Sequence, residues 1–273
     1  MNRDEAEKRS IIRIVSGSKL LGLDTPESDT DEMGVCIEPY SQACGLGKPW
    51  ENFVSEGKGG DCTIYSLRKF VGLALGGNPN LLNLLYAPTA SILRIDARGS
   101  QLQEKAPQIV SRRAGKAFLG YIQSQRSRLD GTKSSHGGHG PMRAALQAAH
   151  GFDTKYAMHM VRLAWQGWEL LATGKLTLPI PDPMRSYLMS LRHGQITLVD
   201  ALEMTAGLEA DIKKEMDAPA TAISGLPLEP DTAAIEQWML RMYWFNWSAE
   251  MKVEDRAYVE QMFPASHIPT DLP

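Results

Sequence analysis

The feature that most constrains this chain is a Gly-Ser pair that follows a short β-branched run and precedes two closely spaced aspartates. Residues 11–15 are β-branched except for Arg13, and the run stops at Ser16-Gly17-Ser18. Asp29-Thr30-Asp31 follows after ten more residues and opens a second extended segment that runs to Ile37. Apolar runs bounded by Gly, Ser and Pro predict buried strands joined by turns. The N-terminal part of the chain is therefore predicted to contain a sheet.

The two aspartates predict a site for divalent metal ions. On an extended strand, residues i and i+2 point to the same side, so Asp29 and Asp31 would place two carboxylates together. Such like charges repel unless a cation neutralises them. Mg²⁺ binds carboxylate oxygens together with substrate phosphates, and two such ions can clamp an in-line phosphoryl displacement. Gly17 lets backbone N–H groups approach a triphosphate, and the Ser18 hydroxyl adds a donor.

The remainder of the chain is predicted to be mostly helical after about residue 90. A third β-prone stretch at residues 62–65 follows a Gly-, Ser- and Pro-rich excursion at 41–60. Helical periodicity and stop signals predict helices at residues 66–75, 80–86, 101–129 (one or two helices), 153–173, 184–192, 198–217 and, after a linker at 218–230, 232–247. This order of elements predicts an α+β protein.

The helix at residues 153–173 carries two separate faces. Its apolar residues recur at helical spacing, Asp153 or Thr154 can cap its start, and Gly174 follows its end. Lys155, His159, Arg162 and Gln166 form a polar stripe beside the apolar one. This stripe is either a solvated face or a cationic surface that closes a nucleotide cleft and meets its phosphates.

Composition restricts the class of protein. The net charge of −3 argues against binding nucleic acid through the overall electrostatic field. A local basic stretch at residues 112–143 is typical of a solvated helix face and loop, or else of an RNA-binding surface. The sequence contains no run of about 18 apolar residues, so it predicts no membrane span. The N-terminus lacks a signal-peptide pattern, and the three cysteines lack metal spacing, so we expect a cytoplasmic protein with reduced thiols.

The stretch from Gly17-Ser18 to Asp29-Thr30-Asp31 and Gly34-Val35 resembles the minimal nucleotidyltransferase signature of the DNA polymerase β superfamily. More narrowly, it is similar to the RNA-repair-associated, YcgL-like predicted nucleotidyltransferases (RlaP). Two further stretches fit that family, at residues 61–80 and 153–162. The resemblance spans about residues 11–175, and the C-terminal hundred residues carry little of it.

The resemblance implies a fold and a third carboxylate. The fold would be a small mixed-sheet palm domain at residues 1–98, followed by a helical domain at 99–273 that closes the nucleotide cleft. Asp61 would join Asp29 and Asp31 in holding two Mg²⁺ or Mn²⁺ ions and could accept the proton of the acceptor hydroxyl. The alternative role of Asp61 is a strand-end aspartate, because the glycine-rich residues 56–60 could displace it from the metal pair.

The resemblance also implies residues that bind the nucleoside triphosphate. Gly17 and Ser18 would contact the phosphates. Arg68 and Lys69 would begin a helix near them, unless they form an ordinary solvated helix face. Lys155, His159 and Arg162 would meet the phosphates from the helical domain.

The implied reaction transfers a nucleoside monophosphate from an NTP to an acceptor hydroxyl and releases pyrophosphate. The acceptor would be an RNA 3′ end, a protein side chain or a small molecule. Two alternatives from other classes stay open. One is a non-catalytic nucleotide-binding or toxin–antitoxin regulatory module, and the other is a helical RNA-binding accessory protein.

Overall fold

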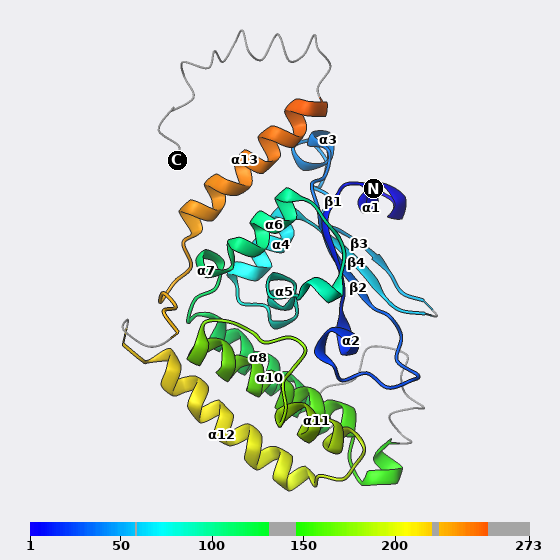
Figure 1. The fold of residues 1–273 in the computed structure, drawn as a ribbon, viewed down its shortest axis with the longest axis vertical. Helices are drawn as coiled ribbons and strands as arrows, with labels where there is room; N and C mark the ends of the chain where they lie inside the picture. Colours follow the sequence, from blue (N-terminus) through cyan, green and yellow to red (C-terminus); the bar gives the residue numbers. More distant parts are fainter. Residues whose placement is uncertain (58, 131–145, 220–223, 251–273) are drawn as a thin grey trace.

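A five-stranded mixed sheet forms one half of the molecule (Figure 1). The computed structural model describes residues 1–57, 59–130, 146–219 and 224–250. The strands are β1 (Ser10–Val15), β2 (Glu32–Cys36), β3 (Asn52–Ser55), β4 (Cys62–Ser66) and β5 (Ile92–Ile95), in the order β3-β4-β2-β1-β5. β2 and β4 run parallel, and the other neighbours are antiparallel. The α+β class and the mixed sheet are therefore confirmed.

The strand pattern follows from burial. In the central strand β1, the side chains of Ile11, Ile12 and Ile14 are at most 1% exposed, so both faces of the sheet are covered there. The edge strands β3 and β5 are four residues each, and half of the Val54 surface on β3 is exposed. Residues 41–60, predicted as an irregular excursion, in fact contain most of the short helix α3 (Tyr40–Ala43) and all of β3.

Short helices surround the sheet. One face carries α4 (Leu67–Leu75), α5 (Pro79–Leu85), α6 (Ala97–Glu104) and α7 (Ala106–Ile109), and α1 (Arg3–Lys8) covers part of the other. A 3₁₀ turn at Thr89–Ser91 leads into β5. A Cβ on Gly99 would lie 2.3 Å from the Ile11 carbonyl oxygen, so α6 packs directly on β1. The boundary predicted after residue 98 thus falls inside a helix that belongs with the sheet.

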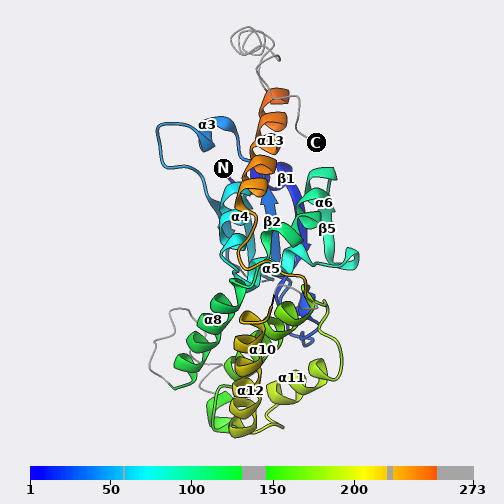
Figure 2. The same cartoon turned by 90° about the vertical axis from the view of Figure 1, so that its left-hand side faces the viewer.

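In its described residues the other half of the molecule, which Figure 2 shows below the sheet, is built mainly from helices. Four of them are α8 (Ala114–Leu129), α10 (Thr154–Thr173), α11 (Met184–Arg192) and α12 (Leu198–Met216), called the helical layer below. α10 packs against the other three and is buried along most of its length. Asp153 Oδ1 accepts the backbone N–H groups of Lys155 and Tyr156, both at 3.0 Å. Gly174 ends α10 with a φ of 79°, so both predicted caps are confirmed.

The last of the described helices, α13 (Thr232–Glu250), returns to the sheet. The Tyr243 hydroxyl donates to Glu38 Oε1 at 3.0 Å and accepts the Arg68 N–H at 3.0 Å. Trp247 Nε1 donates to the Glu38 carbonyl oxygen at 2.8 Å. Glu38 is 2% exposed, and its Oε2 is a buried atom without a hydrogen-bond partner. α13 therefore covers the sheet end where β2 finishes.

In the described part of the basic stretch at residues 112–143, three of the arginines make internal contacts. Arg112 is buried and donates to the Pro219 carbonyl oxygen at 2.6 Å. Arg126 pairs with Glu209 at 3.0 Å, and the Arg128 guanidinium lies over the Tyr156 ring. Lys133 and Arg143 lie outside the described residues. Among the helices that are described, none is both long enough and apolar enough to cross a membrane.

Asp153→Ala should lower the free energy of unfolding by about 1 kcal/mol, because it removes two hydrogen bonds from the first turn of α10. Urea denaturation of both proteins measures this difference. Asp153→Asn keeps an acceptor oxygen and should restore most of the loss. Equal stability of wild type and the alanine variant would contradict the capping role.

Glu38 should make stability depend on pH. Burial raises the pKa of Glu38, which outweighs the lowering by the Tyr243 hydrogen bond. A carboxyl group whose pKa is higher in the folded state binds more protons there, so stability falls as pH rises above its unfolded value of about 4.3. Glu38→Gln cannot ionise. As the pH rises from about 4 to about 7, the free energy of unfolding of wild type should therefore fall more than that of Glu38→Gln. Parallel pH profiles would contradict this expectation.

Candidate functional site

Three segments of the sequence meet at one end of the sheet. β1 is antiparallel to β2, and β2 is parallel to β4, so the C-terminal end of β1 adjoins the N-terminal ends of the other two. Val15 pairs with Glu32, and Glu32 pairs with Cys62. The residues that follow β1 and those that precede β2 and β4 therefore converge, as Figure 1 shows around α2 (Gly17–Leu21). Gly17, Ser18, Asp29, Asp31 and Asp61 all belong to these segments.

The Asp-Thr-Asp segment lies just before β2 rather than within it. The extended strand predicted from residue 29 begins at Glu32, because the preceding residues form a connection between neighbouring strands. Their main chain is nevertheless held on both sides. Ser16 N–H donates to the Asp31 carbonyl oxygen at 2.8 Å, and Thr30 N–H donates to the Gly59 carbonyl oxygen at 3.1 Å.

The Asp31 carboxylate occupies a narrow space between two backbone segments. Its Oδ1 accepts the Asp61 backbone N–H at 3.1 Å. Its Oδ2 lies 2.2 Å from the position that a Cβ on residue 17 would take, and Gly17 has a φ of 64°. Only glycine combines that φ with room for the carboxylate. Gly17 and Asp31 are therefore packed against each other.

The glycine-rich loop brings Asp61 close to this carboxylate. A Cβ on Gly60 would lie 1.9 Å from the Thr30 carbonyl oxygen, and Gly60 has a φ of 132°. The Asp61 carbonyl oxygen accepts the Glu32 N–H at 2.7 Å. Gly59 and Gly60 thus let the main chain of Asp61 lie directly beside Asp31.

The side chains of the three aspartates differ in exposure. Asp29 and Asp61 are exposed, and Asp31 is partly buried. Their ligand oxygens do not all lie within 4.8 Å of one another in the described structure. Whether the three carboxylates share metal ions therefore stays a prediction.

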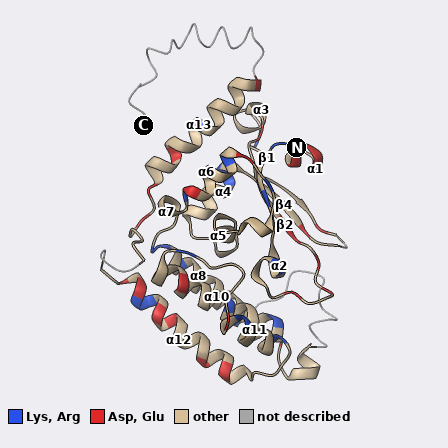
Figure 3. Ribbon diagram, viewed as in Figure 1, with Lys and Arg blue, Asp and Glu red and all other residues tan. Residues whose placement is uncertain are grey.

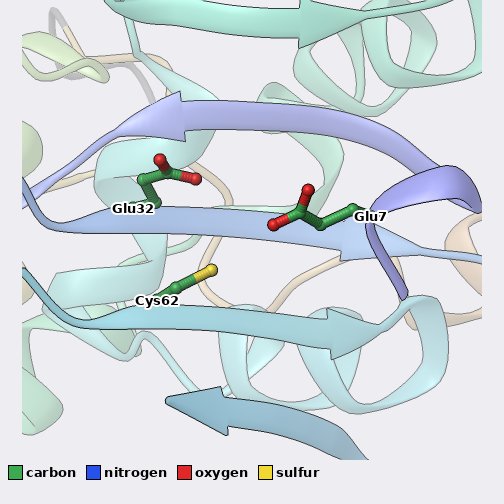
Figure 4. A group of neighbouring side chains, drawn as sticks. All are labelled: Glu7, Glu32 and Cys62. Carbon is green, nitrogen blue, oxygen red and sulfur yellow. The ribbon is translucent and has the colours of Figure 1, made fainter. Parts of the chain in front are cut away.

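Among the described residues, the ligand atoms of a different trio do lie within 4.8 Å of one another. These residues are Glu7, Glu32 and Cys62 (Figure 4). Arginines already neutralise its carboxylates. Arg13 contacts Glu7 at 3.1 Å and Glu32 at 2.5 Å, and Arg3 contacts Glu7 at 2.7 Å. Burial raises the pKa of the Cys62 thiol, which disfavours the thiolate that a metal needs. We interpret this trio as an ion-pair network that fixes α1 to the sheet.

Lys19 adds a positive charge beside the aspartates that the sequence analysis did not single out. Its Nζ donates to the Thr30 hydroxyl, which links α2 to the Asp-Thr-Asp segment. The Ser18 carbonyl oxygen accepts the Leu23 N–H at 2.9 Å, and Gly22 ends α2 with a φ of 70°. The position of Lys19 directly after the Gly-Ser pair is the sequence signal that could have identified it as a candidate site residue.

Arg68 and Lys69 lie at the opposite end of the sheet. They follow the C-terminal end of β4, whereas Asp61 precedes its N-terminal end. Five strand residues separate the two ends, roughly 16 Å at about 3.3 Å per residue. Lys69 pairs with Glu51 at 3.0 Å, and the Arg68 N–H bonds to Tyr243. The structure therefore does not bring these two residues to the predicted phosphate site.

The polar stripe on α10 is not a solvated face where it meets the sheet half. Arg162 and Gln166 are 6% and 1% exposed, and Arg162 Nη1 donates to Gln166 Oε1 at 2.7 Å. Gln166 Nε2 donates to Asn83 Oδ1 on α5 at 3.0 Å. Lys155 and His159 are partly buried. Asn83 was not predicted, although a single amide in the apolar run of residues 81–85 is the kind of buried polar group that signals a specific contact.

α11 and the segment that precedes it bind the C-terminal end of α2 and the residues that follow it. Ile180 N–H donates to the Leu21 carbonyl oxygen at 3.1 Å, and Arg192 Nη1 donates to the Leu23 carbonyl oxygen at 2.6 Å. Figure 3 shows basic residues on α2, α10 and α11 and acidic residues in the connection from α2 to β2. Positive and negative groups thus lie on neighbouring elements at this end of the sheet.

Comparison with known proteins gives a family. A family described as "RNA repair pathway DNA polymerase beta family" (RlaP) matches residues 2–241. An uncharacterised 38.9 kDa protein from the nrdC-mobD intergenic region of Enterobacteria phage T4 is 27% identical over 137 residues, which is 46% of this chain and 40% of that protein. No solved structure matches the chain. Because the family match covers most of the sequence, the chain belongs to the RNA repair pathway DNA polymerase beta family.

Proposed function

We propose that this protein transfers a nucleoside monophosphate from an NTP to an acceptor hydroxyl and releases pyrophosphate. Membership of the polymerase beta family supports nucleotidyltransferase chemistry. The observation that carries the proposal is the placement of the Asp31 carboxylate between Gly17 and the Asp61 N–H. This contact joins the Gly-Ser turn and both acidic segments in one site.

The residues at this site fit a divalent cation. Asp29, Asp31 and Asp61 offer carboxylate oxygens, which Mg²⁺ and Mn²⁺ prefer. A carboxylate has about four acceptor positions, so the single N–H bond to Asp31 Oδ1 leaves room for a metal. We therefore assign Asp29, Asp31 and Asp61 to hold two Mg²⁺ or Mn²⁺ ions. When bound, such ions neutralise charge on the phosphates and on the attacking and leaving oxygens.

The other residues of the site bind and orient the NTP. Gly17 lets the Asp31 carboxylate lie against the backbone of the turn, and the Ser18 hydroxyl can donate to a phosphate oxygen. Lys19 supplies a cation at the same turn. Lys155, His159 and Arg162 approach from the helical layer. Exposed Asp61 can accept the proton of the acceptor hydroxyl.

The proposed acceptor is the 3′ hydroxyl of an RNA, since the family description refers to RNA repair. A protein side chain or a small-molecule hydroxyl has the same nucleophile. Incubating the protein with each α-³²P-labelled NTP, Mg²⁺ and a mixture of total RNA and protein, followed by nuclease or protease digestion, identifies which fraction carries label. Label in RNA supports the proposed acceptor. Label in protein or in small molecules would mean that the acceptor is one of these instead of RNA. Nucleotide binding without pyrophosphate release from any acceptor would support a non-catalytic module instead.

Asp29→Asn and Asp31→Asn should each lower Mg²⁺-dependent NTP consumption by at least about a hundredfold, because a neutral amide cannot replace a metal-binding carboxylate. Release of pyrophosphate measures the rate. Glu209→Gln, which removes an acid that pairs with Arg126 in the helical layer, should leave the rate unchanged. Wild-type turnover in either aspartate variant would refute the metal assignment.

Gly17→Ala should abolish turnover, because its Cβ would overlap Asp31 Oδ2 and its φ of 64° strains any L side chain. Gly207→Ala in α12 is the matched control, since nothing lies within 4 Å of the Cβ that it adds. The control should keep full activity and gain up to about 1 kcal/mol of helix stability. Equal pyrophosphate release by the two variants would show that the contact between Gly17 and Asp31 does not matter for activity.

A further inference from the structure

Arg162 is a buried cation without an anionic partner. Its side chain is 6% exposed, and its Nε is a buried atom with no hydrogen-bond partner. The hydrogen bond that it does make goes to the neutral amide of Gln166. Within the described part of the chain, it forms no ion pair with a carboxylate, and the nearby buried Glu169 accepts the Thr177 N–H at 3.2 Å instead.

Such an arrangement is costly in the unliganded protein. A charged group in an apolar interior is destabilising unless an opposite charge and hydrogen bonds compensate for its lost hydration. Burial lowers the pKa of Arg162 to about 10, so the guanidinium still carries its charge at neutral pH. A group of this kind fits a role in binding an anion rather than a role in stability.

Gln166 and Asn83 hold this guanidinium in place. Both amides are at least nine-tenths buried. Gln166 Oε1 accepts from Arg162 Nη1, and Gln166 Nε2 donates to Asn83 Oδ1, which links α10 to α5. Neither amide neutralises the charge. They fix the orientation of Arg162 and leave its Nε without a partner.

Arg162 lies near the contact between the helical layer and the sheet half. Gln166, one helical turn away on α10, donates to Asn83 of the sheet half. The same helical layer contacts the segment that follows the Gly-Ser turn, because Arg192 of α11 donates to the Leu23 carbonyl oxygen. One helical layer therefore carries Arg162 and contacts the segment of the Gly-Ser turn.

We propose that Gln166 and Asn83 are positioning residues that direct Arg162 at the polyphosphate of the bound nucleotide. This inference rests on the proposed function and deepens it. It makes the helical layer part of the nucleotide site and gives the three buried side chains one common role. A guanidinium binds phosphate oxygens through paired N–H donors in a fixed plane.

Binding of inorganic tripolyphosphate tests the proposal without catalysis. Isothermal titration calorimetry in low salt and without divalent metal should show at least about tenfold weaker binding for Arg162→Met than for wild type. Arg113→Met, at an exposed arginine, is the control and should bind like wild type. Arg162→Lys keeps the charge and should bind with intermediate affinity.

Gln166→Glu separates positioning from a structural role. The new carboxylate would pair with Arg162, so this variant should melt at a higher temperature than wild type and yet bind tripolyphosphate at least about tenfold more weakly. Arg162→Met should likewise keep or raise the melting temperature. A purely structural network predicts lower melting temperatures for both variants and unchanged binding by whatever protein stays folded.

Two results would overturn the proposal. One is wild-type tripolyphosphate affinity in both Arg162→Met and Gln166→Glu, and the other is a large loss of stability in both with no loss of affinity. The outcome is independent of the catalytic assignment, because Asp31→Asn should keep Arg162-dependent tripolyphosphate binding. If no acceptor is ever labelled but this binding pattern holds, the proposed reaction fails and the polyphosphate site stands.

Discussion

The contact between the Asp31 carboxylate and the backbone at Gly17 and Asp61 is the constraint on which the site depends. A carboxylate that accepts a backbone N–H and packs against a glycine cannot move without disturbing both neighbouring strands. The strand order reinforces this contact, because β1 and β4 lie on either side of β2. The Gly-Ser turn and both acidic segments are thus attached to the ends of three adjacent strands of the sheet.

The helical layer is joined to the sheet half by polar contacts as well as by apolar packing. Ile180 and Arg192 bind main-chain oxygens at the end of α2 and just after it, while Gln166 donates to Asn83 on α5. Hydrogen bonds between buried groups require a defined geometry, so they specify how the two halves are placed relative to each other. The role proposed for Arg162 requires this fixed placement.

The parts of the fold that could be predicted are those with strong local signals. The first strand, its Gly-Ser end and α10 with both caps are written in short stretches of sequence. β3 and β5 were missed because edge strands of four residues bury too little surface to show an apolar pattern. The placement of Arg68 and Lys69 depends on topology: they are close to Asp61 in sequence, but a strand that crosses the sheet separates them. The burial of Arg162 depends on packing by other helices, which periodicity does not reveal.

The position of α13 has a consequence for the order in which the protein folds during its synthesis. Tyr243 and Trp247 bind Glu38 across sequence separations of 205 and 209 residues. On a ribosome, strands β1 to β5 emerge long before their cover at this end exists, so Glu38 stays accessible to water until the last helix is made. Contacts of such long range slow folding and leave incompletely covered surface in the meantime. A chain that ends before residue 232 would lack this covering helix and leave this end of the sheet exposed.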